Sequence, residues 1–185
     1  MMSLALVISS CSKDDEGENK GGSNGGTTNS QLVGDWKLIE WRDYDIEGTF
    51  ANMNITFANM EDKEYESYYD DKEYYSFTSD GVWYEITIEG KYEYAVNKCN
   101  VSTANGQIKV IKQTGATGLT YSDDNLNYMS DSEIVAFAKK SNFGDYGGLM
   151  ELSKGMTMDY KIIDGKLYVI DNHFGSSVSI YKKMN

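Results

Sequence analysis

The chain has 185 residues, which is enough for one folded domain with a terminal extension. It carries 17 basic and 29 acidic residues, and its formal net charge of −12 argues against nucleic acid as a partner, because affinity for phosphates comes largely from Lys and Arg. A hydrophobic fraction of 40% can supply a packed core, and with 18 glycines and no proline the turns must use Gly, Asn, Asp or Ser.

Residues 1–10 form a short, uncharged apolar run that is too short to cross a bilayer as a helix and is typical of the end of a secretory signal. The run ends in Ile8, two serines and Cys11, a sequence that resembles the lipobox of bacterial lipoproteins. The resemblance implies that residues 1–10 are removed as a signal peptide. It also implies that Cys11 carries acyl chains, palmitate among them, that hold the protein on a membrane.

Residues 12–16 (SKDDE) resemble the acidic export signal of surface lipoproteins in Bacteroides-type bacteria, and a solvated charge run in a tether is the alternative interpretation. Residues 17–30 contain no large apolar side chain and cannot bury enough surface to fold. As a flexible coil, residues 12–30 would span roughly 24 Å. We therefore expect a lipidated tether over residues 11–30, an anchor in the outer membrane at the cell surface, and one folded domain over residues 31–185.

The folded domain opens with QLVGDWKLIEW at residues 31–41. Apolar or small residues alternate with others from Leu32 to Leu38, as in a strand with one buried face. Ile39 and Trp41 fall on the opposite parity, which predicts a bulge or burial on both faces near the end of this strand.

Gly34 and Trp36 form a G-x-W motif in this strand, and the motif resembles the first-strand signature of lipocalins and related calycin barrels. In that family the tryptophan closes the barrel floor and the glycine lets backbone pass close beside it. The resemblance covers residues 31–185 in pattern but only Gly34 and Trp36 in motif. It implies a ligand cup at the open end of the barrel.

Strand patterns separated by turn signals fill most of the remaining chain. The clearest alternation runs over residues 82–89, after a turn at residues 79–81. Asn105-Gly106 and Asp164-Gly165 are two-residue hairpin signals. Further strand patterns cover residues 75–77, 92–96, 108–110, 156–162, 167–169 and 178–180. Short strands at this spacing predict an antiparallel barrel of about eight strands, with a β-sandwich as the alternative.

One helix is expected among these strands, at residues 131–141. Ser130 and Glu133 have the spacing of a capping box, and Ile134, Phe137 and Ala138 fall on one helical face. Lipocalins place their helix after the eighth strand, whereas two or three strands follow it here. We therefore expect a mainly β, lipocalin-like barrel with an inserted short helix that plugs the barrel or covers an edge of the sheet.

The sequence contains no recognisable motif for catalysis or cofactor binding. His173 is the one histidine, and in a predicted turn without a cysteine or second histidine nearby it is expected to be structural or exposed. Cys99 is expected to be a small buried hydrophobe. We expect no enzyme activity, no metal and no cofactor, and the alternative is an enzyme that uses two converging carboxylates in a cleft.

A partial calcium-loop pattern follows the first strand. Asp43, Asp45, Glu47 and Gly48 match its first half, but Asn54 stands where a bidentate glutamate is needed. An acidic loop leaving the first strand is the preferred interpretation.

Residues 61–75 (EDKEYESYYDDKEYY) combine five tyrosines with many charged residues. Exposed tyrosines beside carboxylates suit sugars, which stack on rings and form hydrogen bonds, and they also suit protein interfaces. The alternative is a long acidic loop whose tyrosines half-pack on the barrel. The candidate surface contacts are Tyr65, Tyr68, Tyr69 and Trp83, the last because it lies on the polar parity of its strand.

A ligand cup would be lined by inward-facing side chains of the predicted strands. The candidates are Tyr84, Tyr92, Tyr94, Met156 and Met158, although the same side chains would also fill a solid barrel. Two functions follow as expectations. The chain is either a surface-anchored binding module for a small apolar molecule or a glycan, or a structural or interaction lipoprotein that contacts another envelope protein or a host protein.

Overall fold

A computed structural model describes residues 26–44, 55–68, 72–144, 155–171 and 177–185. The expected lipid attachment site and several candidates lie outside these residues, namely Cys11, Asp45, Glu47, Gly48, Asn54, Tyr69 and His173. Within the described part of the chain, no helix has the length and apolarity needed to cross a membrane.

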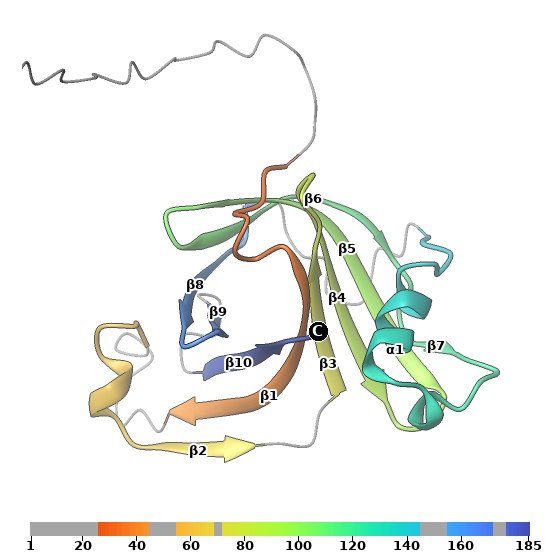
Figure 1. Ribbon diagram of the computed structural model, residues 1–185, viewed down its shortest axis with the longest axis horizontal. Coiled ribbons are helices and arrows are strands. Elements are labelled where there is room, and N and C mark those ends of the chain that lie inside the picture. The colour runs from red at the N-terminus through yellow and green to blue at the C-terminus, as the bar shows by residue number, and fades with distance from the viewer. Residues whose placement is uncertain (1–25, 45–54, 69–71, 145–154, 172–176) are drawn as a thin grey trace, which may run out of the picture.

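The chain folds as a closed antiparallel barrel (Figure 1). Its eight strands are β1 Gly34–Tyr44, β3 Lys72–Phe77, β4 Val82–Glu89, β5 Glu93–Ala104, β6 Gln107–Ala116, β8 Thr157–Ile163, β9 Lys166–Asp171 and β10 Ser177–Lys183. Strands that follow one another along the chain are neighbours in the sheet, and pairing of β1 with β10 closes the barrel. The predicted barrel of eight strands is confirmed, and the sandwich alternative is wrong.

Two short strands extend the barrel wall. β2 (Tyr65–Tyr68) pairs with the last residues of β1, and β7 (Thr120–Tyr121) pairs with the first residues of β5. The tyrosine-rich segment is therefore not one long loop, because it contains the 3-10 helix η2 (Met60–Asp62), β2 and the start of β3. A second 3-10 helix, η3 (Leu126–Tyr128), precedes the one α-helix of the described residues, α1 (Asp131–Ala138).

The two predicted hairpin turns are present. Asn105 and Gly106 have φ angles of 54° and 75°, and Asp164 and Gly165 have φ angles of 50° and 75°. Positive φ at both central residues is the requirement of the type I′ turn, which Asn-Gly and Asp-Gly satisfy with little strain.

The predicted bulge in the first strand is also present. The register between β1 and β10 shifts between Leu38 and Glu40, so that Ile39 is the extra residue. Leu38 pairs with Tyr181 before the bulge, and Trp41 pairs with Ser179 after it. Because Tyr181 and Ser179 are two residues apart on β10, Leu38 and Trp41 face the same side of the sheet.

The barrel interior is a single buried cluster to which all eight barrel strands contribute. Tyr75 and Tyr181 stack there with ring centroids 4.3 Å apart, and Tyr75 meets Trp83 edge to face at 5.0 Å. Cys99 belongs to this cluster, as expected for a buried hydrophobe. Trp83 is 1% exposed, so the predicted surface contact at this position is wrong. The parity that appeared polar in β4 is the inner face of the barrel.

Residues 26–32 belong to the folded domain, which corrects the expected tether boundary for residues 26–30. The amide of Thr103 donates to the Thr27 carbonyl at 2.9 Å, which ties the segment to β5. Leu32 is buried in the interior cluster, and its carbonyl accepts a hydrogen bond from Trp36 Nε1 at 2.8 Å. This segment and Trp36 close one end of the barrel.

α1 packs on the outer face of β3, β4 and β5 (Figure 1), so the predicted location as a plug or edge cover is wrong. The predicted capping box is present, with the Ser130 hydroxyl accepting from the Glu133 amide and the Glu133 carboxylate accepting from the Ser130 amide. The helix buries Ile134, Val135 and Ala138 and ends at Ala138 rather than near residue 141. A second outer patch, on β1, β9 and β10, is covered by residues 55–60.

Candidate functional site

The two ends of the barrel differ in their connections. At the turn end, short connections at residues 78–81, 105–106 and 164–165 join the strands, and residues 26–32 lie across it. At the loop end, β1 leads into residues 45–64 and β6 leads into residues 117–156. Long connections on a rigid barrel are where binding residues usually lie, so the loop end is the first place to search.

The inner face of the barrel becomes polar toward the loop end. Glu73 pairs with Thr87 across β3 and β4, Glu85 pairs with Asn97 across β4 and β5, and Gln113 on β6 pairs with the interior residue Cys99. All of these polar side chains are partly exposed, so solvent reaches the inner face at this end. Large apolar side chains fill the turn end instead.

The polar inner face is ordered by hydrogen bonds. Asn97 Nδ2 donates to Glu85 Oε2 at 2.8 Å, and Gln113 Nε2 donates to Asn97 Oδ1 at 3.2 Å. The Tyr181 hydroxyl donates to the Glu73 carboxylate. Burial raises the pKa of Tyr181 well above its ordinary value, and the charge of Glu73 raises it further. The hydroxyl is therefore a neutral donor that fixes the position of Glu73.

An aromatic pair lies at the loop end on the inner side of the sheet. Trp41 pairs with the inward-facing Ser179 on one side and with Tyr68 on the other. The rings of Trp41 and Tyr68 lie 5.2 Å apart and are tilted by 45°. Tyr68 is 48% exposed, and its hydroxyl donates to Glu66 Oε2 at 2.8 Å. An exposed ring and a carboxylate therefore lie next to each other here.

The other described tyrosine of β2 faces the opposite way. Tyr65 pairs with Tyr44, which packs in the outer cluster under residues 55–60. Tyr65 is 43% exposed, and Arg42 Cζ lies 4.5 Å from its ring centroid. The structure thus separates the two predicted contact tyrosines, with Tyr68 on the inner side and Tyr65 on the outer side.

The predicted lining residues are divided in the same way. Met158 lies in the barrel interior, and Met156 packs against it. Tyr84 and Tyr94 lie in the outer cluster under α1, so the expectation that they face inward is wrong. The reason is that α1 provides an apolar cover outside β4 and β5. Tyr92 precedes β5 and stacks on Tyr121 with centroids 5.4 Å apart.

The sequence pattern does not predict the polar inner residues Glu73, Glu85, Asn97 and Gln113. Glu85 belongs to the more polar of the two alternating sets of residues in β4. In a sheet with one buried face, the more polar set is expected to face solvent. One feature of the sequence does indicate a polar position on the inner face. In β5, Asn97 and the interior residue Cys99 are two residues apart and therefore lie on the same face of the strand.

Metal binding has no support in the described residues. No group of three or more His, Cys, Asp or Glu side chains there is arranged to hold a metal ion. Cys99 is a free, buried thiol, and burial, together with the charge of Glu85, raises its pKa to about 12. A thiol that stays protonated at neutral pH is a poor nucleophile and a poor metal ligand.

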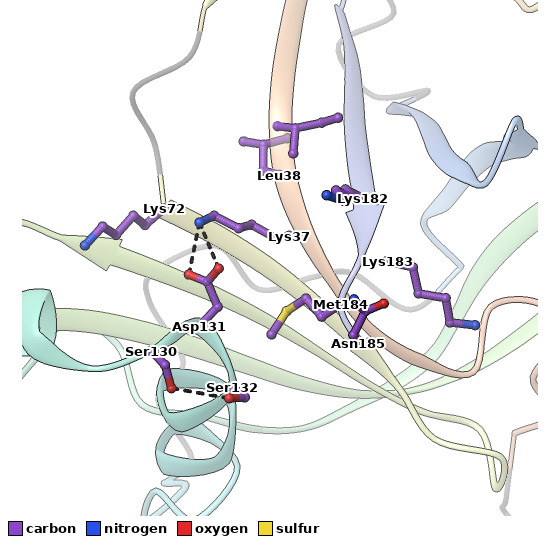
Figure 2. A pocket seen from close by; sticks show the side chains of 11 residues that line it. Lys37, Leu38, Lys72, Ser130, Asp131, Ser132, Lys182, Lys183, Met184 and Asn185 are labelled. Carbon is purple, nitrogen blue, oxygen red and sulfur yellow. Dashed lines mark hydrogen bonds and ion pairs between the residues drawn. The ribbon is translucent and has the colours of Figure 1, made fainter.

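A separate cavity of about 750 Å³ lies on the outer wall, between the start of α1 and the paired strands β1 and β10 (Figure 2). Lys37 Nζ lies 2.9 Å from Asp131 Oδ2 and 3.0 Å from Oδ1, and this ion pair joins β1 to α1 inside the cavity. The sequence could not indicate this cavity, because it depends on the register of β1 with β10.

The chain matches no family model, no curated protein and no solved structure. Its function therefore has to be inferred from the arrangement of its own residues.

Proposed function

We propose that this protein is a binding module for a glycan or a similarly polar small ligand, held at the loop end of a lipocalin-like barrel. The observation that carries the proposal is the ring pair of half-buried Trp41 and exposed Tyr68, on the same inner side of the sheet that presents Glu85 and Asn97. Sugar rings stack on aromatic faces, and their hydroxyls form hydrogen bonds with carboxylates and amides.

The same geometry favours a polar ligand over the apolar one that the sequence left open. Trp36, Phe77 and Trp83 fill the turn end with fully buried rings. The partly exposed inner positions are instead Glu73, Glu85 and their neighbours, and an apolar ligand would cover these polar groups and displace the solvent that hydrates them.

The anchoring part of the proposal rests on the sequence. Residues 8–11 resemble a lipobox and residues 12–16 an export signal, so we propose attachment through lipidated Cys11 to the outer membrane, with the barrel at the cell surface. Cys11→Ala should release the protein from the membrane fraction of expressing cells and remove the acyl mass from the intact protein. Retention of the variant on the membrane would contradict lipid anchoring.

Ligand binding can be tested with two tyrosine variants of the full-length protein on an array of neutral and acidic oligosaccharides. Tyr68→Ala should lose about tenfold or more in affinity, because it removes both the stacking ring and the hydroxyl that holds the Glu66 carboxylate in place. Tyr65→Ala is the matched control, since it removes a similarly exposed ring from the same strand on the outer side. Equal binding by both variants and the unchanged protein would contradict the proposed site.

A second candidate function is contact with an envelope or host protein. The exposed Tyr65 ring beside Arg42 favours it, since tyrosine and arginine are enriched in interfaces. Cross-linking on intact cells separates the two functions, because a protein partner captured through this face should be lost in Tyr65→Ala and retained in Tyr68→Ala.

A further inference from the structure

A row of three lysines crosses the outer wall of the barrel in exact strand register. Lys166 on β9 pairs with Lys182 on β10, and Lys182 pairs with Lys37 on β1. Directly opposed residues on neighbouring strands have Cβ atoms about 5 Å apart, and like charges at this spacing repel. Two successive like-charge pairs are unexpected in a protein whose net charge is −12.

The row leads into the outer cavity beside α1. Lys37, Lys72 and Lys182 line this cavity together with Ser130, Ser132 and Asp131. In Figure 2, Lys37 and Lys72 come from neighbouring strands and flank Asp131, while the Lys183 side chain points away from them. Lys183 lies instead over the Trp36 ring, 5.2 Å from its centroid.

The positive charge of the cavity is only partly balanced. Asp131 accepts from Lys37 and from the Tyr74 hydroxyl, whose oxygen lies 2.8 Å away. Lys72 donates to the uncharged side chain of Asn127 at 2.8 Å. Lys182 has no hydrogen-bond or ion-pair partner among the described residues. Lys183 also lines the cavity, but its ammonium group lies over Trp36. The other three lysines against the carboxylate of Asp131 leave two positive charges, which match one dianion.

The cavity also offers groups that suit the remaining parts of a ligand. Ser132 brings a hydroxyl at the amino end of α1, where the helix dipole favours negative charge, while the Ser130 hydroxyl is used by the capping box. Leu38, Ile39 and Met184 add apolar surface to the lining. A volume of about 750 Å³ lies within the range of small-molecule sites.

We propose that this outer cavity binds a phosphate monoester carried on a small, partly apolar body, with Lys72 and Lys182 as its main charge partners. A phosphate monoester carries about −1.5 to −2 charges at pH 7 and so matches the excess positive charge. Lysine is a common phosphate partner because it acts as a mobile point charge. This site is independent of the glycan site at the loop end, and either can fail without the other.

The test is isothermal titration of the full-length protein with phenyl phosphate, with phenyl sulfate as the monoanion of similar shape. Phenyl phosphate should bind at least about tenfold more tightly than phenyl sulfate. Lys182→Met and Lys72→Met should each weaken phenyl phosphate by about tenfold, since each removes one charged contact. Asp131→Asn should strengthen binding, because it frees Lys37.

Lys161→Met is the matched control, because Lys161 is an exposed lysine of β8 outside the cavity and its loss changes the net charge equally. Unchanged binding by this variant supports a built site. A loss equal to that of Lys182→Met would overturn the proposal, because attraction would then come from diffuse charge.

Vesicle flotation separates a soluble phosphate from a lipid head group as the source. A site for a lipid phosphate predicts that vesicles containing phosphatidic acid capture the protein, whereas vesicles of phosphatidylcholine alone do not. It also predicts that Lys182→Met abolishes this capture. Binding of phenyl phosphate without vesicle capture would assign the site to a soluble ligand. Absence of both kinds of binding in the unchanged protein would overturn the proposal.

Discussion

At the scale of single residues, burial in the barrel interior and under α1 keeps several ionisable groups in their neutral forms. Burial, assisted by the charge of Glu85, raises the pKa of Cys99 to about 12. Burial also raises the pKa of Tyr74 and Tyr181, and each hydroxyl faces a carboxylate, Asp131 or Glu73. All three groups hold a proton more tightly in the folded chain than in the unfolded chain. Their contribution to stability is therefore complete below their ordinary pKa values and is lost as the pH rises.

Cys99→Ala should make stability less dependent on alkaline pH. The pKa of the thiol is about 9 in the unfolded chain and about 12 in the folded chain. Between these two values, ionisation of the thiol in the unfolded chain lowers the free energy of unfolding by up to about 1.4 kcal/mol per pH unit. Urea unfolding at pH 8, 9, 10 and 11 should give a shallower decline for the variant by about this amount. The cavity left by the substitution lowers the free energy of unfolding by the same amount at every pH, so it does not change the slope. Parallel curves for the two proteins would show that the thiol does not titrate as expected.

Gly34→Ala should destabilise the barrel at its turn end. Gly34 has a φ of +124°, and a Cβ there would lie 3.1 Å from Lys183 Cε. We expect a loss of roughly 1–3 kcal/mol in the free energy of unfolding, because the backbone strain and the close contact add. Gly90→Ala is the control: its φ is also positive, at +75°, but a Cβ would meet nothing within 4 Å. Equal losses in both variants would mean that the contact with Lys183 has no energetic effect.

At the scale of elements, α1 is joined to β1 at both of its ends. Asp131 pairs with Lys37 near the start of the helix, and Lys139, directly after it, pairs with Asp35 at 2.8 Å. The apolar side of the helix packs on Tyr74, Ile86 and their neighbours. Exposed or half-exposed ion pairs contribute little on their own, so the packing and the capping box provide most of the anchoring.

Ser130→Ala should lower the free energy of unfolding by about 1 kcal/mol, because it removes the side-chain cap of α1. Ser132→Ala should change it by less than half of that, since Ser132 lies inside the first turn and does not cap the helix. Urea unfolding followed by circular dichroism measures both. A loss in Ser132→Ala as large as that in Ser130→Ala would contradict the capping role.

Local elements could be predicted from the sequence because each depends on residues close together in the chain. The turns at Asn105 and Asp164, the bulge after Leu38 and the Ser130 cap all follow from local backbone preferences, and all are present. Face assignment is different. Alternation shows that a strand has two unlike faces, but not which face looks inward. Tyr84 was therefore placed inside and Trp83 outside, the reverse of the structure.

At the scale of the whole molecule, β1 holds the barrel together because it pairs with β10 on one side and with β2 and β3 on the other. The candidate sites also arise only at this scale. The lysine row needs the register of three strands, and the polar inner face needs closure of the sheet. Neither can be predicted from the order of residues alone, since neither involves neighbours in the chain.

Amide hydrogen exchange should distinguish strands that pair on both sides within the closed barrel from strands that pair on one side. The amides of β10 pair on both sides with β9 and β1, and we expect them to be among the slowest to exchange. Among the described residues β2 pairs with β1 alone, and all four of its residues are exposed, so its amides should exchange fastest among the strands. Protection of β2 equal to that of β10 would indicate a cover on β2 and would favour the interaction function.

Closure by β1 and β10 also sets the order of events during synthesis. Trp36 emerges from the ribosome well before its partner Lys183, so the seam of the barrel cannot form until almost the whole domain has been made. A nascent chain of this protein therefore stays open along one side while it is translated.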